Sequence, residues 1–145
     1  MFKFSIKKMI AGATACIAMG ALATSAMATS STVFTGGGTL NLYGSNYSST
    51  NFPQVAPSGT ISKISYKWQL NRQASKLTVK LCAGTNCTTV LNNGSAISGT
   101  GSTTIFNGLP ASQIFHFEFK TTTGSTGSVI SPSLYQLQHS LTMTY

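Results

Sequence analysis

Apolar and polar side chains alternate one by one through most of the chain, and this two-residue period constrains its fold more than any other feature. In residues 61–70, one face would carry Ile64, Tyr66, Trp68 and Leu70, and the other Lys63, Ser65, Lys67 and Gln69. Successive side chains of a β-strand point to opposite sides, whereas those of a helix repeat every 3.6 residues. Because spacing of the helical kind is nearly absent beyond residue 28, the pattern predicts an all-β protein.

The same alternation predicts further strands. The clearest are residues 76–82, 114–120 and 135–145, and shorter candidates are 32–34, 39–43, 88–91 and 102–106. Residues 71–75 are predicted to form a polar loop, and clusters rich in glycine, proline or asparagine separate the other strands, at 36–38, 53–59, 92–94, 99–101, 108–110 and 124–127. Short strands with one apolar face can bury those faces only against another sheet. We therefore expect a small antiparallel β-sandwich, with a partly closed β-barrel as the alternative.

The first 28 residues have the order of features found in secretory signal peptides. Three lysines within the first eight residues precede an apolar segment at 9–22, and the small residues Ala26 and Ala28 follow it. The apolar segment is shorter than the roughly 20 residues that span a bilayer, which argues against a retained anchor. We predict cleavage after Ala28, which leaves residues 29–145 as one β-sandwich domain without a membrane span. Its predicted location is the periplasm, with secretion or surface display as the alternative.

The charge of the exported part argues against several functions. The whole chain has nine basic residues and one acidic residue, and three of the lysines belong to the predicted signal peptide. Six basic residues then face a single acid, Glu118. Nucleic-acid binding usually needs denser clusters of Lys and Arg, and acid–base catalysis by paired carboxylates needs a second carboxylate. We expect neither activity.

The cysteines follow from export. Cys16 would be removed with the signal peptide, which leaves Cys82 and Cys87 as a pair in an oxidising compartment. Four residues that favour a turn separate them, so two strand ends could bring the cysteines within bridging distance. We predict a disulfide that closes a hairpin and stabilises the fold by about 2 kcal/mol, since the loop is short. Zinc binding is not expected, because His116 and His139 fit no zinc-ligand spacing with these cysteines.

The two histidines are the remaining candidates for chemistry. His116 shares a strand face with Glu118, and this two-residue spacing marks a solvated pair more often than an active site. His139 falls on an otherwise apolar face, which is typical of a hydrogen-bonded, half-buried histidine. A Ser-His-Asp triad lacks its Asp, and no glycine-rich stretch opens a helix to hold phosphate. We expect no enzyme, no cofactor and no metal.

An aromatic strand followed by a strand that ends in Leu-Cys gives the chain a family resemblance. The matching residues are Tyr66 to Leu70, Leu77 to Cys87, Gly108-Leu109-Pro110, Phe115 to Phe119, Ser131-Pro132-Ser133-Leu134 and the C-terminal Tyr145. This arrangement resembles the flagellar FlhE family over most of residues 29–145. The resemblance implies a periplasmic β protein without catalysis that acts in flagellar assembly, export or swarming by binding protein. Components of the export apparatus or rod would be its partners.

A basic surface is the one patterned feature left on the predicted exterior. If residues 61–70 and 76–82 form a hairpin, Lys63, Lys67, Lys76 and Lys80 stand on one face with Arg72 at the tip. Outward lysines also discourage pairing between sheet edges, so solubility alone could explain them. The functional interpretation is a candidate docking surface for an acidic protein or an anionic envelope polymer. Tyr66 and Trp68 could form a carbohydrate platform if exposed, but their alternation with lysine favours a place in the core.

A second function of a different class stays open. The exported part is rich in Ser, Thr, Gly and Asn and nearly free of acids, and it ends in a strongly alternating segment. This composition also suits a secreted or surface structural subunit or adhesin of the pilin-like, fibre-forming type, which would self-associate. Such a subunit needs a donated strand to complete its fold. The sequence shows no separate donor extension, because the segment at residues 29–34 is short and is soon followed by three glycines at 36–38.

Overall fold

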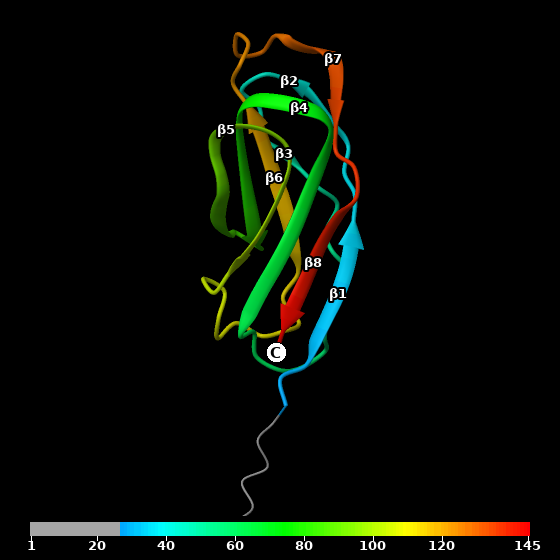
Figure 1. Cartoon of the computed structure of the whole chain (residues 1–145), viewed down its shortest axis with the longest axis vertical. Helices are drawn as coiled ribbons and strands as arrows, with labels where there is room; N and C mark the ends of the chain where they lie inside the picture. The colour runs from blue at the N-terminus through cyan, green and yellow to red at the C-terminus, as the bar shows by residue number, and fades with distance from the viewer. Residues whose placement is uncertain (1–26) are drawn as a thin grey trace, which may run out of the picture.

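The computed structural model describes residues 27–145 and contains only strands and their connections there (Figure 1). The strands are β1 (Ser30–Thr35), β2 (Thr39–Leu42), β3 (Tyr47–Ser48), β4 (Lys63–Ala83), β5 (Asn86–Thr103), β6 (Phe115–Thr121), β7 (Val129–Tyr135) and β8 (His139–Thr144). The predicted signal peptide lies outside the described residues except for its last two. Within residues 27–145, no helix has the length and hydropathy needed to cross a membrane.

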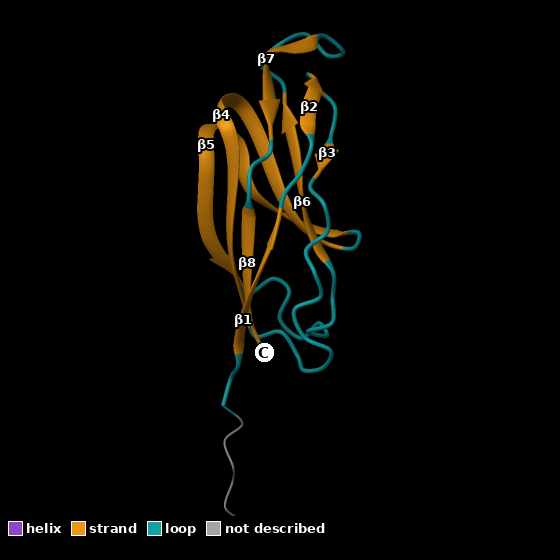
Figure 2. Cartoon of the chain, turned by 90° about the vertical axis from the view of Figure 1, so that its right-hand side faces the viewer, coloured by secondary structure: helices purple, strands orange, loops and turns teal. Residues whose placement is uncertain are grey.

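One long bent hairpin organises the sheet. β4 is a continuous strand of 21 residues whose first part pairs with β8 and whose second part pairs with β6. β5 runs antiparallel to β4 along most of both parts. Because β4 folds over, a single sheet in the order β1-β8-β4-β6-β3, with β5 along β4, curls into a half-barrel (Figure 2). β2 and β7 form a separate two-stranded sheet. The predicted all-β, antiparallel fold class is confirmed.

The predicted loop at residues 71–75 is wrong, because these residues belong to β4. The predicted hairpin between 61–70 and 76–82 is wrong for the same reason, since both segments pair with β5 instead of with each other. The bend shows in the backbone and in the register. Lys76 and Asn93 have positive φ angles of 45° and 50°, which non-glycine residues seldom adopt. The β4–β5 pairing shifts register on both sides of Ala74, so the bend interrupts the ladder without ending the strand.

The glycines of β5 were expected to break the strand, but they lie inside it because aromatic rings cover them. Gly99 is paired with Trp68, and Gly101 is paired with Tyr66. A Cβ atom at Gly99 would come within 2.6 Å of the Trp68 ring, and one at Gly101 within 2.5 Å of the Tyr66 hydroxyl. The missing side chains therefore make room for the rings. The short strand predicted at 88–91 lies wholly within β5. Of the strand predicted at 102–106, only residues 102–103 belong to β5.

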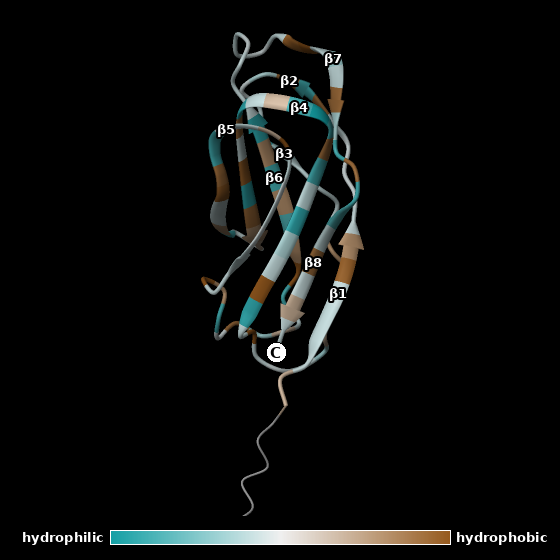
Figure 3. Ribbon diagram, in the orientation of Figure 1, coloured by the Kyte–Doolittle hydropathy of each residue, from teal (hydrophilic) through white to brown (hydrophobic). Residues whose placement is uncertain are grey.

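The core lies on the concave side of the half-barrel, between the two parts of β4. Trp68 from the first part packs edge-to-face on Phe119 of β6, with ring centroids 5.9 Å apart. Along both parts, apolar and polar residues alternate as the sequence predicts, visible as bands of brown and teal (Figure 3). The largest fully buried side chains are Trp68, Phe52, Phe115, Phe117, Phe119, Leu40, Ile61, Ile64, Leu70, Leu77, Leu81 and Leu134. Since Trp68 is buried, the core interpretation holds and a carbohydrate platform at this position is excluded.

The long C-terminal strand predicted at 135–145 is interrupted. β7 ends at Tyr135 and β8 begins at His139, and the alternation changes phase between them, since Tyr135 is exposed and Gln136 is buried. The Gln136 backbone N–H donates to the carbonyl of Gly38, and the Leu137 N–H donates to that of Gln69. At these hydrogen bonds, the chain passes from the two-stranded sheet to the six-stranded sheet. Gln136 is therefore buried, although the alternation predicts that it is exposed.

Candidate functional site

The Cys82–Cys87 disulfide closes the end of the β4–β5 hairpin. The two cysteines face each other across the strands, with their Cα atoms 4.0 Å apart and their sulfurs bonded. Ala83 pairs with Asn86, which leaves Gly84 and Thr85 as a two-residue turn. Gly84 has a φ of 59° at the first central position, where a type II′ turn requires glycine. The predicted disulfide and its hairpin are confirmed.

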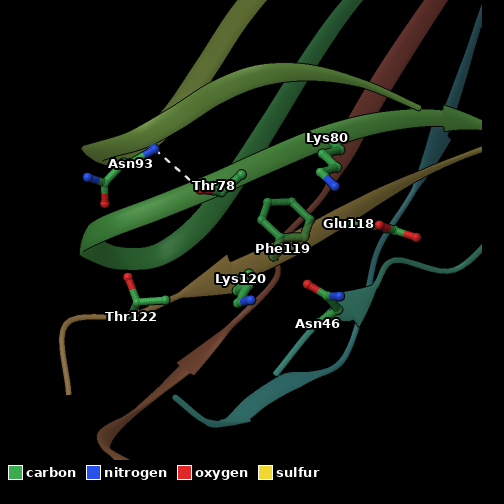
Figure 4. A pocket seen from close by; sticks show the side chains of 8 residues that line it. All are labelled: Asn46, Thr78, Lys80, Asn93, Glu118, Phe119, Lys120 and Thr122. Carbon is green, nitrogen blue, oxygen red and sulfur yellow. Dashed lines mark hydrogen bonds between the residues drawn. The ribbon is translucent and has the colours of Figure 1, made fainter. Parts of the chain in front are cut away.

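A polar groove lies on the outer side of β4 and β6 (Figure 4). Its volume is about 350 Å³, and its walls come from β4, β5, β6 and the turn before β3. The lining residues are Asn46, Thr78, Lys80, Asn93, Glu118, Phe119, Lys120 and Thr122. Apart from Phe119, whose side chain belongs to the core, each of them offers a charged or hydrogen-bonding group to solvent.

Strand register determines how these groups are placed. Thr78 pairs with Lys120, and Lys80 pairs with Glu118, across the antiparallel β4–β6 ladder. Because side chains on one strand point the same way at every second residue, all four lie on the outer face. Asn93 enters from the β5 side, where its backbone N–H donates to Thr78 Oγ1 at 3.3 Å. The lining groups on β4, β5 and β6 are thus carried by paired strands.

The groove has two positive charges and one negative charge. Within residues 27–145, the one contact between a basic and an acidic side chain at salt-bridge distance joins His116 Nε2 to Glu118 Oε1 at 3.5 Å. Neither Lys80 nor Lys120 therefore has a carboxylate of the described chain within salt-bridge distance. The ammonium groups donate hydrogen bonds, and the neighbouring amides and hydroxyls both donate and accept them. This arrangement suits the binding of acidic or polar groups.

The predicted docking residues do not share one face as the hairpin would require. Lys63 and Lys67 lie on the part of β4 that pairs with β8, Lys80 lies on the part that pairs with β6, and Lys76 is at the bend. Arg72 is engaged within the fold: its Nε donates to the carbonyl of Ser133 at 3.2 Å, and its Nη2 donates to that of Pro132. It therefore ties β4 to β7 and is not at a hairpin tip.

Sequence reasoning missed the other half of the groove. Nothing in the sequence indicates that Lys120 lies beside Lys80, because the two residues come from strands that are distant along the chain. Asn46 and Thr122 come from connecting segments. Their only signal is a polar residue type, which most connecting segments share.

His139 is a structural residue. It is fully buried, more than the half-buried state predicted, and its ring packs between Phe117 and Phe119 with centroids 5.4 and 5.3 Å away. Its Nδ1 accepts a hydrogen bond from the Gln69 backbone N–H at 3.2 Å, so its Nε2–H donates to Gln136 Oε1 at 3.1 Å. Burial lowers the pKa of His139 to about 4, and the ring is neutral at pH 7. Because the side chain has no exposed surface within residues 27–145, a substrate cannot reach the ring.

His116, in contrast, lies beside the disulfide. It pairs with Cys82 across β4 and β6, and the Cys82 sulfur, a His116 nitrogen and a Glu118 oxygen all lie within 4.8 Å of one another. The predicted His116–Glu118 pair on one strand face is present. With Cys82 bonded to Cys87, the oxidised protein offers a metal only the imidazole and the carboxylate.

The half-barrel with its polar outer groove defines a small, antiparallel all-β protein. A family model described as flagellar protein FlhE matches residues 37–145, and the chain belongs to this family. The resemblance predicted from the sequence is confirmed. Comparison with curated protein sequences finds no match.

Solved structures share the fold. A crystal structure of FlhE is similar with a TM-score of 0.69 and 22% identity, over 83% of this chain and 98% of that one. A serine protease of Aeromonas sobria, also solved in complex with the chaperone ORF2, is similar with a TM-score of 0.58 and 10% identity. That likeness covers 80% of this chain and 27% of the protease chain. At these identities, the likenesses show the fold alone.

Proposed function

We propose that this flagellar-family protein is a non-catalytic periplasmic accessory factor that binds an acidic protein surface through the polar groove during flagellar assembly or export. The observation that carries the proposal is the pair of ammonium groups, Lys80 and Lys120, held on adjacent strands without a carboxylate of the described chain in salt-bridge range. The paired strands fix the backbone positions of the two lysines, so binding has to order only their side chains.

The charge of the whole exported part supports this role. Six basic residues against one acid give it a positive field, which speeds the approach of an acidic partner. Once the partner is close, the ammonium, amide and hydroxyl groups of the groove would form short-range hydrogen bonds with its carboxylates. Rod or export components with exposed carboxylates are the partners we propose.

The periplasmic location is supported by two independent features. The signal-like residues 1–28 would direct export, and the Cys82–Cys87 disulfide is of the kind that persists in an oxidising compartment. The absence of catalysis is supported by the side chains available: the single carboxylate residue, Glu118, is paired with His116, and His139 is buried and neutral.

The pilin-like alternative is less well supported. A fibre subunit needs an N-terminal strand to donate, and β1 is already paired with β8 of its own chain from Ser30 to Thr35. Because β1 is paired within its own chain, it is not available to complete the sheet of a neighbouring subunit.

A matched pair of double variants tests the proposal. Lys80→Gln/Lys120→Gln removes the groove charges, whereas Lys63→Gln/Lys67→Gln removes the same charge from exposed positions on the other part of β4. We expect the groove variant to lose at least tenfold in capture of rod or export components by periplasmic cross-linking, and to fail in complementing flagellar assembly. The control variant should bind nearly as well as the wild type. Equal loss in both variants would indicate general charge attraction, and no loss in either would exclude the groove as the docking site.

A further inference from the structure

Three side chains with metal-binding groups, Cys82, His116 and Glu118, meet near the closed end of the β4–β5 hairpin, and Cys87 is bonded to the first of them. Cys82 and Cys87 face each other across the hairpin, and His116 of β6 pairs with Cys82 on its other side. Glu118 lies two residues further along β6, on the same face as His116. The Cys82 sulfur, a His116 ring nitrogen and a Glu118 carboxylate oxygen lie within 4.8 Å of one another, and the Cys87 sulfur is bonded to that of Cys82.

These residue types form a set that zinc accepts. Zn²⁺ is held by four ligands from cysteine thiolate, histidine nitrogen and carboxylate oxygen, and a pair of cysteines separated by two to four residues is a frequent half of such a site. Cys82 and Cys87 have a separation of four intervening residues. The sequence argues against zinc because His116 lies far along the chain, but strand pairing removes that objection.

The site is reachable from solvent. Cys82 is fully buried, whereas Cys87 is exposed, and the side chains of His116 and Glu118 are 16% and 28% exposed. An incoming ion would meet Cys87, His116 and Glu118 first and then Cys82 beneath them. Because Cys87 is exposed, its side chain has room to rotate once the disulfide is open, so that both sulfurs can face one ion.

We propose that Cys82, Cys87, His116 and Glu118 form a Zn²⁺ site that exists only when the disulfide is reduced. The thiols are present before the disulfide has formed, or after a dithiol has transferred two electrons and two protons to it and become a disulfide itself. Zinc binding then displaces the two thiol protons. The hairpin end is thus held by a covalent bond in the oxidised state and by a metal ion in the reduced state.

Cobalt provides a direct probe, because Co²⁺ occupies zinc sites and thiolate ligands give it intense charge-transfer absorption. The purified protein is reduced with a dithiol, freed of the reductant without air, and titrated with CoCl₂ and then with ZnCl₂. We expect one Co²⁺ per chain with thiolate absorption that zinc abolishes by displacement. The oxidised protein should show no such absorption at the same concentrations.

Single substitutions separate a four-ligand site from a simple dithiol. His116→Gln and Glu118→Gln keep both cysteines, and circular dichroism of the oxidised forms checks that the variants fold. We expect each to weaken Co²⁺ binding to the reduced protein at least tenfold, whereas Lys67→Gln should leave it unchanged. The absence of thiolate absorption in the reduced wild type would overturn the proposal, and so would wild-type affinity in both the His116 and Glu118 variants. Glu118 also lines the groove, but Co²⁺ titration of the purified protein involves no protein partner, so failure of the metal site and failure of the docking proposal remain distinguishable.

Discussion

At the scale of single residues, His139 makes the stability of the core depend on pH. Its neutral ring fills the space between two phenylalanines and satisfies both the Gln69 N–H and the Gln136 side chain. In most proteins, acid unfolding is dominated by carboxylates that must be protonated. Residues 29–145 have one carboxylate side chain, Glu118, so a buried histidine can dominate instead.

The free energy of unfolding should therefore fall between about pH 6.5 and pH 4. The pKa of His139 is about 4 in the folded protein and about 6.5 when unfolded, so the unfolded state binds more protons in this range. The stabilisation by the neutral ring is complete above pH 6.5 and is lost as the pH approaches 4, by on the order of 3 kcal/mol. Urea unfolding at pH 7 and at pH 4 measures this loss of unfolding free energy. A His139→Phe variant should be less stable at pH 7 and much less sensitive to pH, and the same pH dependence in both proteins would contradict the assignment.

Gly99 shows how much the core depends on a missing side chain. A Cβ atom there would come within 2.6 Å of the Trp68 ring, which is buried and has little room to move. Gly99→Ala should lower the free energy of unfolding by about 1–3 kcal/mol, as overpacking does in other cores. Gly38→Ala is the control, because a Cβ atom at Gly38 would meet no atom within 4 Å. Chemical denaturation of both variants compares them, and equal stabilities would show that Trp68 can shift.

At the scale of the elements, the hairpin formed by β4 and β5 depends on its closed end. Its 39 backbone positions, Lys63–Ala83 and Asn86–Thr103, are joined by a two-residue turn and one disulfide. The bridge encloses few residues, so it removes a limited amount of entropy from the unfolded chain. Cys82→Ser/Cys87→Ser should cost about 2 kcal/mol in unfolding free energy and keep the fold. Circular dichroism together with urea titration distinguishes this outcome from loss of the sheet, which would mean that the bridge is required for folding.

The sequence predicted which faces of the strands are buried but not how the strands connect. The alternation in 64–70, 77–81 and 115–119 follows directly from burial on one side, and all of these faces are in the core. Residues 71–75 look like a loop because they are polar, yet they bend a continuous strand, since the Arg72 guanidinium and the Asn71 amide bond to the backbone of β7. The partners of Asn71 and Arg72 lie about 60 residues further along the chain. The pattern of residues 71–75 alone therefore cannot predict the bend.

The same reason explains what was missed in the candidate site. The disulfide was predictable because both cysteines lie in one local hairpin. The groove and the His116–Cys82 proximity depend on β6 pairing with the second part of β4. The core contacts that accompany this pairing, Phe119 on Trp68 and both Phe117 and Phe119 on His139, join residues far apart in the sequence. Lys63, Lys67 and Lys80 were correctly expected to face outward, but the fold-over of β4 divides them between its two parts.

At the scale of the whole molecule, the position of β1 decides between a self-contained protein and a fibre subunit. β1 pairs with β8 from Ser30 to Thr35 within one chain, and outward-facing hydroxyls join the two strands, with Ser30 Oγ 3.0 Å from Thr144 Oγ1. A fibre subunit would instead place this strand in its neighbour. A Ser30→Cys/Thr144→Cys variant reports which chain supplies β1, because its new cysteines are adjacent across the ladder. We expect a bridge within one chain, seen as an oxidised species that migrates as a monomer on non-reducing gels, with Ser30→Cys alone as the control. Ladders of linked chains that appear only in the double variant would show strand exchange and would favour the pilin-like function.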